Sequence, residues 1–92
     1  MDSLITYLKS KLNLNDFTLI KTASNKLVIF KCFSKYTKCI YISVFDDFLE
    51  IRVDKIFDTK VFYPGIERLL ISKRIFNNMD ETLYYIQKNI IL

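Results

Sequence analysis

The sequence predicts an α+β fold in a single domain spanning residues 1–92. Apolar residues repeat at helical spacing near both ends of the chain and at every second position between them. The expected strands also follow one another without intervening helices, which favours an antiparallel meander over a parallel α/β sheet. We therefore expect an N-terminal helix, four to five strands, and one or two C-terminal helices packed on one sheet face.

Helical spacing defines the elements at the two ends. The first helix should cover residues 2–12, with an apolar stripe formed by Leu4, Ile5, Leu8 and Leu12. A helix is also expected over residues 66–76, where apolar residues recur three and four positions apart. The last helix should begin after Asn78, because Glu81 follows it at capping-box spacing. Its buried stripe should contain Met79, Leu83, Ile86 and Ile90.

Two-residue periodicity predicts the strands. We expect them at residues 17–22, 26–33, 38–45 and 48–54, with a weaker fifth strand at residues 60–63. Asn25 and the pair Asp46-Asp47 suit the tight turns between strands, because Asn and Asp tolerate the backbone conformations that such turns need.

Pairing across these turns predicts two unlike faces of the sheet. One face is aliphatic and should form the core. Its expected members are Ile20, Leu27, Ile29, Ile40, Ile42, Val44, Leu49, Ile51 and Val53. The other face mixes large aromatic residues with charged ones, whereas a sheet face turned only to water is normally polar. This second face should therefore either be covered by residues 55–63 or 66–76 of the same chain, or bind a partner.

The expected registers also pair Phe30 with Tyr41 and Cys32 with Cys39. Two cysteines are too few for a disulfide framework or a four-ligand zinc site. Facing each other across a hairpin, they could be two reduced thiols or form a strained disulfide.

Composition excludes several classes of enzyme. The chain contains no histidine, so Ser-His and Cys-His dyads and histidine-ligated metals are absent. Its single glycine, Gly65, cannot build a glycine-rich phosphate loop. We therefore predict a protein that is not an enzyme, with no catalytic residues, no cofactor and no bound metal.

Charge and aromatic residues suggest two kinds of partner. Protein–protein contact is the first, because the mixed face should present the aromatic residues at its centre. The predicted interface residues are Phe30, Tyr41, Phe45, Phe48 and Arg52. We expect a homodimer formed through this aromatic face or through an edge strand, with a host or viral protein as a further partner.

Single-stranded nucleic acid is the alternative partner. Residues 16–45 hold five lysines and one aspartate, and aromatic residues lie close to them in sequence. Basic side chains beside aromatic rings can bind the backbone and stack the bases of a single strand. The predicted contacts on this lysine lobe are Lys21, Lys31, Lys35 and Lys38.

The amino-acid composition indicates the kind of genome that encodes the protein. Phe, Tyr, Met, Ile, Asn and Lys, all encoded by A/T-rich codons, make up 46 of the 92 residues. This composition is typical of A/T-rich genomes, such as those of large DNA viruses, some phages, low-GC bacteria and several parasites. Because the chain is also short and has no enzyme motif, we favour a viral accessory protein. The beginning of the chain lacks a signal-peptide pattern, and no apolar run is long enough to span a membrane. We expect an intracellular protein that does not bind membranes, in the host cytoplasm or nucleus if it is viral.

Overall fold

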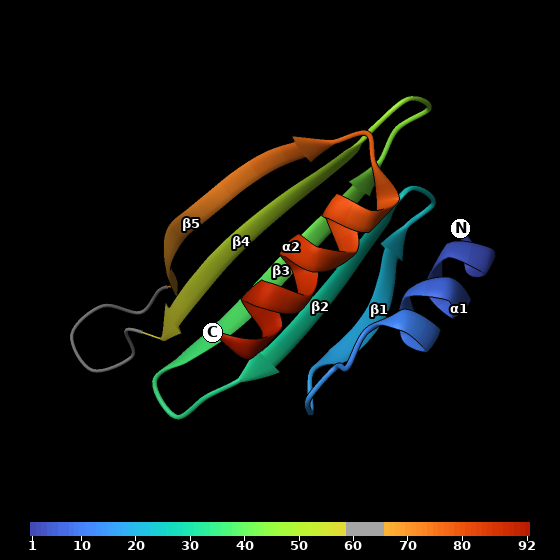
Figure 1. Ribbon diagram of the computed structural model, residues 1–92. Coiled ribbons are helices and arrows are strands. Elements are labelled where there is room, and N and C mark those ends of the chain that lie inside the picture. Colours follow the sequence, from blue (N-terminus) through green and yellow to red (C-terminus); the bar gives the residue numbers. More distant parts are fainter. Residues whose placement is uncertain (59–65) are drawn as a thin grey trace.

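A computed structural model describes the backbone of residues 1–58 and 66–92 and the side chains of residues 1–57 and 68–92. The elements follow the order α1 (Asp2–Lys11), β1 (Thr18–Ala23), β2 (Lys26–Cys32), β3 (Tyr36–Val44), β4 (Leu49–Asp58), β5 (Ile66–Phe76) and α2 (Met79–Ile91) (Figure 1). The strands form one antiparallel sheet in the order β1-β2-β3-β4-β5. The predicted α+β meander is confirmed.

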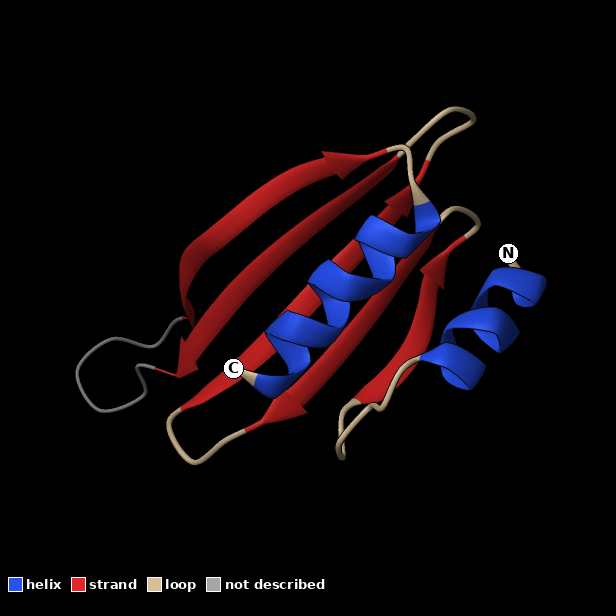
Figure 2. Ribbon diagram, viewed as in Figure 1, coloured by secondary structure: helices blue, strands red, loops and turns tan. Residues whose placement is uncertain are grey.

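Both helices contribute to a single core on one face of the sheet. Helix α2 runs along one face of the sheet, roughly parallel to the strands, and α1 lies next to β1 (Figure 2). The buried cluster joins leucines of α1 and isoleucines of α2 to the aliphatic strand residues. It consists of Leu8, Leu12, Phe17, Leu19, Leu27, Ile29, Ile40, Ile42, Ile51, Val53, Ile86 and Ile90. We call this side of the sheet the covered face and the opposite side the open face.

Residues 66–76 form strand β5 and not the predicted helix. The strand contains a β-bulge, because Val53 pairs with Ser72 and Asp54 pairs with Leu70, leaving Ile71 as an extra residue. A bulge breaks the two-residue alternation, so the sequence pattern came to resemble helical spacing. Pairing with β4 then favours the strand over the helix, because it provides hydrogen-bond partners for backbone N–H and C=O groups of both strands. The strand predicted at residues 60–63 lies outside the described residues.

The predicted register between β1 and β2 is wrong by one residue. Leu19 pairs with Ile29 and Ile20 pairs with Val28. A one-residue shift moves every side chain of a strand to the other face. Phe17 and Leu19 are therefore buried in the core, whereas Ile20 lies on the open face with 44% of its surface exposed.

The predicted register between β2 and β3 is wrong by two residues. Phe30 pairs with Cys39, and Cys32 pairs with Thr37, so neither the Phe30–Tyr41 pair nor the Cys32–Cys39 pair exists. The Phe33 amide donates to the Tyr36 carbonyl, which shortens the connection to a two-residue turn. Because the shift is an even number, the predicted face of each side chain is retained. The predicted pairing of β3 with β4, including Ile42 with Ile51, is confirmed.

Helix α2 begins as the sequence predicts. Asn78 is its N-cap, and the Asn78 side-chain oxygen accepts a hydrogen bond from the Glu81 amide at 3.1 Å. Ile86 and Ile90 are fully or almost fully buried, and Met79 and Leu83 are half-buried. Within the described residues, no helix has the length and apolar character needed to cross a membrane.

Candidate functional site

The five predicted interface residues form two separate groups. Phe30, Tyr41 and Arg52 lie on the open face, where each is half-buried. Phe45 and Phe48 lie at the tip of the β3–β4 hairpin, where their rings stack with centroids 4.6 Å apart. Both tip rings are exposed. The structure therefore brings three of the predicted residues together and leaves two at one end of the sheet.

A charged cluster occupies the middle of the open face. Asp54 on β4 is fully buried, although both described helices contribute to the core on the other face. Its Oδ1 accepts a hydrogen bond from Arg52 Nε at 2.9 Å, and its Oδ2 lies 3.4 Å from Arg68 Nη1. Arg68 also lies over the Tyr41 ring, with its guanidinium carbon 5.7 Å from the ring centroid. Two arginines from neighbouring strands therefore share one carboxylate.

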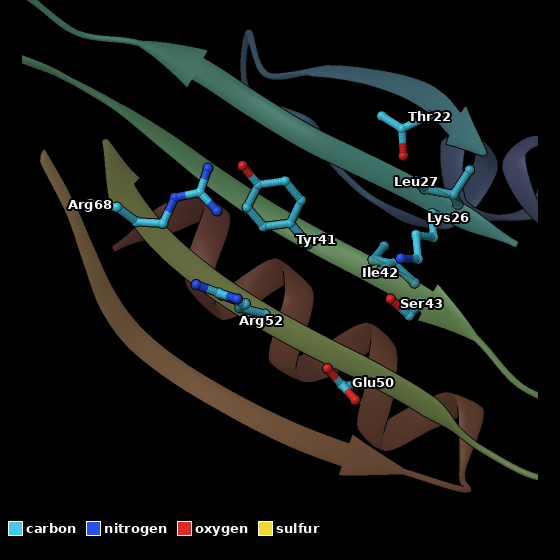
Figure 3. A pocket seen from close by; sticks show the side chains of 9 residues that line it. All are labelled: Thr22, Lys26, Leu27, Tyr41, Ile42, Ser43, Glu50, Arg52 and Arg68. Carbon is cyan, nitrogen blue, oxygen red and sulfur yellow. The ribbon is translucent and has the colours of Figure 1, made fainter. Parts of the chain in front are cut away.

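A hollow of about 220 Å³ lies beside this cluster. Figure 3 shows its lining from the open face, with Arg68 reaching across β4 towards Tyr41 and α2 behind the sheet. The residues that line it are Thr22, Lys26, Leu27, Tyr41, Ile42, Ser43, Glu50, Arg52 and Arg68. Glu50 lies 3.7 Å from Lys73, which partly neutralises it. The hollow is thus lined mainly by basic and hydroxyl-bearing groups.

Sequence reasoning identified only part of this open-face cluster. Arg52 and Tyr41 were predicted to share a face, and the register confirms that they pair. Asp54 continues the alternation of Glu50 and Arg52 along β4, so the same pattern could have revealed it. The position of Arg68 in this cluster could not be predicted, because residues 66–76 were expected to be helical.

The two cysteines do not form a reactive pair. Both are free thiols, with Cys32 exposed and Cys39 buried on the open face. Burial raises the pKa of the Cys39 thiol, so the thiol stays protonated at neutral pH and is a poor nucleophile. Burial also raises the pKa of the neighbouring Tyr41 hydroxyl, which keeps it protonated and able to donate a hydrogen bond.

The four predicted lysines do not share a surface with Phe30 and Tyr41. Lys21 pairs with Leu27 and lies 4.0 Å from Asp2, and Lys31 pairs with Lys38, so these three lysines are on the covered face. Lys35 is exposed in the β2–β3 turn. Lys38 is buried, and its ammonium donates to the main-chain oxygens of Asn89 and Leu92 at the end of α2. The predicted lysine lobe is therefore divided.

Lys31 contributes to a different cluster at the end of the covered face. Its ammonium lies 5.3 Å from the centroid of the Phe33 ring and 5.9 Å from that of Phe17. Phe33 stacks on Tyr36, with centroids 4.8 Å apart. Lys31 thus contributes to the packing of this end through cation–π contacts.

Strand β5 carries four of the exposed large apolar residues in the described part of the chain. Leu69, Leu70, Ile71 and Ile75 are between 46% and 64% exposed, and β5 lies at the end of the strand order. We call these four residues the β5 edge surface. Next to it, Arg74, Phe76, Tyr84, Tyr85 and neighbouring charged residues line a groove of about 520 Å³ between β5 and α2. The other edge strand, β1, has only six residues and lies beside α1 (Figure 1).

Within residues 1–57 and 68–92, no three potential metal ligands among Cys, Asp and Glu come together. No family model, curated protein or solved structure matches the chain. The assignment of function therefore depends on the surfaces described above.

Proposed function

We propose that this protein is a non-enzymatic binding module that acts through protein–protein contact and forms a homodimer through the β5 edge surface. The observation that carries the proposal is the run of exposed apolar residues Leu69, Leu70 and Ile71 on an edge strand of eleven residues. The expectation of an edge-strand contact is thereby favoured over one through the aromatic face.

An edge strand supports association in two ways. Its outward backbone N–H and C=O groups can pair with another strand, and its apolar side chains lose water on contact. Eleven residues at about 3.3 Å each give an edge roughly 36 Å long. Such an edge, with the groove beside it, is long enough for a standard interface of about 800 Å² per partner.

Leu70 and Ile75 lie on the open face at its β5 edge, because they pair with Asp54 and Glu50. The part of the open face around the charged cluster is less suited to apolar self-association than this edge. Arg52, Arg68 and Asp54 form the cluster, and a second copy packed there would remove two arginines from water. Desolvating charges offsets much of the gain from apolar contact. The aromatic residues at the tip, Phe45 and Phe48, are too far along the sheet to extend the same patch, so they contribute a separate small surface.

Charges around the β5 edge surface restrict how two copies can pair. Arg68 precedes the apolar run, and Lys73 and Arg74 follow it. Antiparallel pairing centred on Leu70 places Arg68 opposite Ser72 of the second copy. A shift of one or two residues in one direction places Arg68 opposite Lys73 or Arg74, where like charges repel. We therefore propose a short contact centred on Leu70, with side-chain packing on both sides of it.

The amino-acid composition supports a viral, intracellular and non-enzymatic protein. The excess of residues with A/T-rich codons favours a small accessory protein of viral origin that acts inside a cell. The lack of histidine supports a non-enzymatic role. The alternative of nucleic-acid binding by the lysine lobe has less support, because Lys38 is buried under α2 and Lys21 and Lys31 lie on the covered face.

Leu70→Glu tests the proposal. We expect the wild-type chain to have twice its monomer mass of 11.0 kDa, at both low and high salt, across the micromolar range. Leu70→Glu should be monomeric, because a carboxylate cannot be buried unpaired at the centre of the interface. Light scattering after size exclusion measures both masses, and circular dichroism checks that the variant is folded.

Ile20→Glu is the matched control. Ile20 lies on the opposite edge strand and is 44% exposed, close to the 49% of Leu70, so the change in hydrophobicity and charge is the same. This variant should remain a dimer. A monomeric wild-type protein, or equal loss of the dimer in both variants, contradicts the proposal. Dissociation by Tyr41→Asp but not by Leu70→Glu places the interface on the aromatic face instead.

A further inference from the structure

We propose that the hollow on the open face binds nucleotide units of a single-stranded nucleic acid, with a phosphate held by Arg52 and Arg68 and a base against Tyr41. Arg68 lies next to the β5 edge surface on β5, but the other residues that line the hollow lie on or next to strands β1–β4, and the inference does not depend on self-association. It also uses none of the four lysines predicted from the sequence.

Asp54 holds the two arginines in position. The carboxylate is fully buried, and it contacts Arg52 on its own strand and Arg68 on the neighbouring strand. Its Oδ2 has no hydrogen-bond partner among the described residues, although Arg68 Nη1 lies 3.4 Å away. The two guanidinium groups therefore converge before any ligand arrives, and less conformational entropy is lost on binding.

Both arginines keep donors for a ligand. A guanidinium has five N–H donors. The described contacts to Asp54 involve one nitrogen of Arg52 and one nitrogen of Arg68. The side chains remain 40% and 47% exposed, respectively, so they are open to the solvent. Planar, forked donors of this kind suit the oxygens of a phosphate.

The surrounding charge also favours an anion. Lys26, Arg52 and Arg68 line the hollow together with one carboxylate, Glu50. Glu50 is near Lys73, and Asp54 lies beneath the arginines. Four cations therefore surround two carboxylates, and the excess positive charge attracts a phosphate.

Planar groups beside the arginines favour a nucleotide over an acidic peptide. The Arg68 guanidinium lies over the Tyr41 ring, with its central carbon 5.7 Å from the ring centroid, and a base can extend this stack of flat groups. Phe30 lies on the same face as a diagonal neighbour of Tyr41, because Phe30 pairs with Cys39 and Val28 pairs with Tyr41. Diagonal neighbours are roughly 7–8 Å apart, so a second base can reach Phe30.

The size of the hollow favours a polymer over a free nucleotide. Its volume of about 220 Å³ is below the roughly 300–1,000 Å³ of pockets that enclose a small molecule. It can hold one phosphate and part of a sugar while the rest of the ligand extends along the open face. A single strand suits this arrangement, because its neighbouring units add contacts outside the hollow.

Arg68→Gln and Arg74→Gln form a matched pair that tests the site. Both arginines belong to β5, and each lies over a tyrosine, but Arg74 faces Tyr85 on the covered side. We expect the wild-type protein to bind a fluorescein-labelled single-stranded oligothymidine, with an affinity that falls as salt rises. Arg68→Gln should weaken binding about tenfold or more, and Arg74→Gln less than about threefold, as measured by fluorescence anisotropy.

Changes at Tyr41 test the stacking step and keep the proposal testable if Arg68→Gln fails to fold. Tyr41→Ala should weaken binding about fivefold or more. Tyr41→Phe should bind with nearly the affinity of the wild-type protein, because it keeps the ring that stacks on the base. Thermal unfolding followed by circular dichroism identifies variants that retain the fold.

Other ligands separate the possible sources of binding. We expect the oligonucleotide to bind more tightly than AMP, and AMP more tightly than inorganic phosphate. No oligonucleotide binding by the wild-type protein, or equal losses for Arg68→Gln and Arg74→Gln, overturns the proposal. So does equal affinity for inorganic phosphate or for a short polyglutamate peptide, because either result removes the role of the base.

Discussion

Among the side chains that the structure describes, each face of the sheet buries one charged group, but the two are held differently. Lys38 on the covered face is buried under α2 and donates to the main-chain oxygens of Asn89 and Leu92. Asp54 on the open face is held by the side chains of Arg52 and Arg68, which are themselves partly exposed. One charge is therefore fixed by the backbone of a helix and the other by groups that also reach the solvent.

This difference separates stability from binding. The last main-chain oxygens of a helix lack partners within the helix, so Lys38 completes the end of α2. Two of its three N–H donors are used at the end of α2, and the side chain is buried, so its contacts serve the fold. The arginines around Asp54 retain contact with water and are able to exchange it for a ligand. We therefore expect substitutions on the covered face to affect mainly folding, and those on the open face to affect mainly binding.

Ile51→Ala and Ile20→Ala compare the two faces directly and should give the largest difference. Ile51 is fully buried on the covered face, whereas Ile20 is 44% exposed on the open face. We expect Ile51→Ala to lower the free energy of unfolding by about 2–5 kcal/mol, and Ile20→Ala by less than about 1 kcal/mol. Urea unfolding measures both. Similar losses would show that the open face is packed as closely as the core.

Asp54→Asn tests whether the buried carboxylate holds the arginines. Removing its charge should lower the free energy of unfolding by about 1–2 kcal/mol, because the contacts with two arginines are weakened. The loss stays this small because both arginines are partly exposed and can be solvated by water. The Nε resonances of Arg52 and Arg68 in NMR spectra should also broaden or shift towards solvent-exposed values. Unchanged resonances would mean that the arginines are positioned by other contacts.

Lys38→Met should have the smallest effect at neutral pH, below about 1 kcal/mol, because the loss of its hydrogen bonds is offset by removing a buried charge. Burial, and secondarily Lys55, lowers the pKa of Lys38 from 10.5. The unfolded state then binds more protons between the lowered pKa and pH 10.5, so the stability of the wild-type protein should rise with pH in that interval relative to Lys38→Met. Parallel curves for the two proteins, from thermal unfolding at several pH values, would contradict this assignment.

Particular residues show which parts of the fold the sequence pattern could predict. The alternation along residues 40–53 correctly predicted the aliphatic face, because both strands run regularly and their turn is short. The Asn78 cap was also predictable, since capping depends only on neighbouring residues. Ile20 was assigned to the wrong face because a single residue in the β1–β2 register inverts the strand.

The candidate sites were less predictable than the fold. Tyr41 and Arg52 were expected on one surface and do pair, but Arg68 and the β5 edge surface depend on residues 66–76 being a strand. Helical and strand periods cannot be told apart in a short apolar run that contains a bulge. Lys38 was placed with the other lysines because nothing in its neighbours indicates that α2 ends over it.

The sequence by itself determined the α+β class, the order of most elements, the aliphatic core face and the start of α2, because periodicity and capping are local properties. Only the tertiary structure decided that residues 66–76 pair with β4, that two arginines meet at Asp54, and that β5 remains an open edge. These features arise between residues distant in sequence, where pairing and burial override local preference.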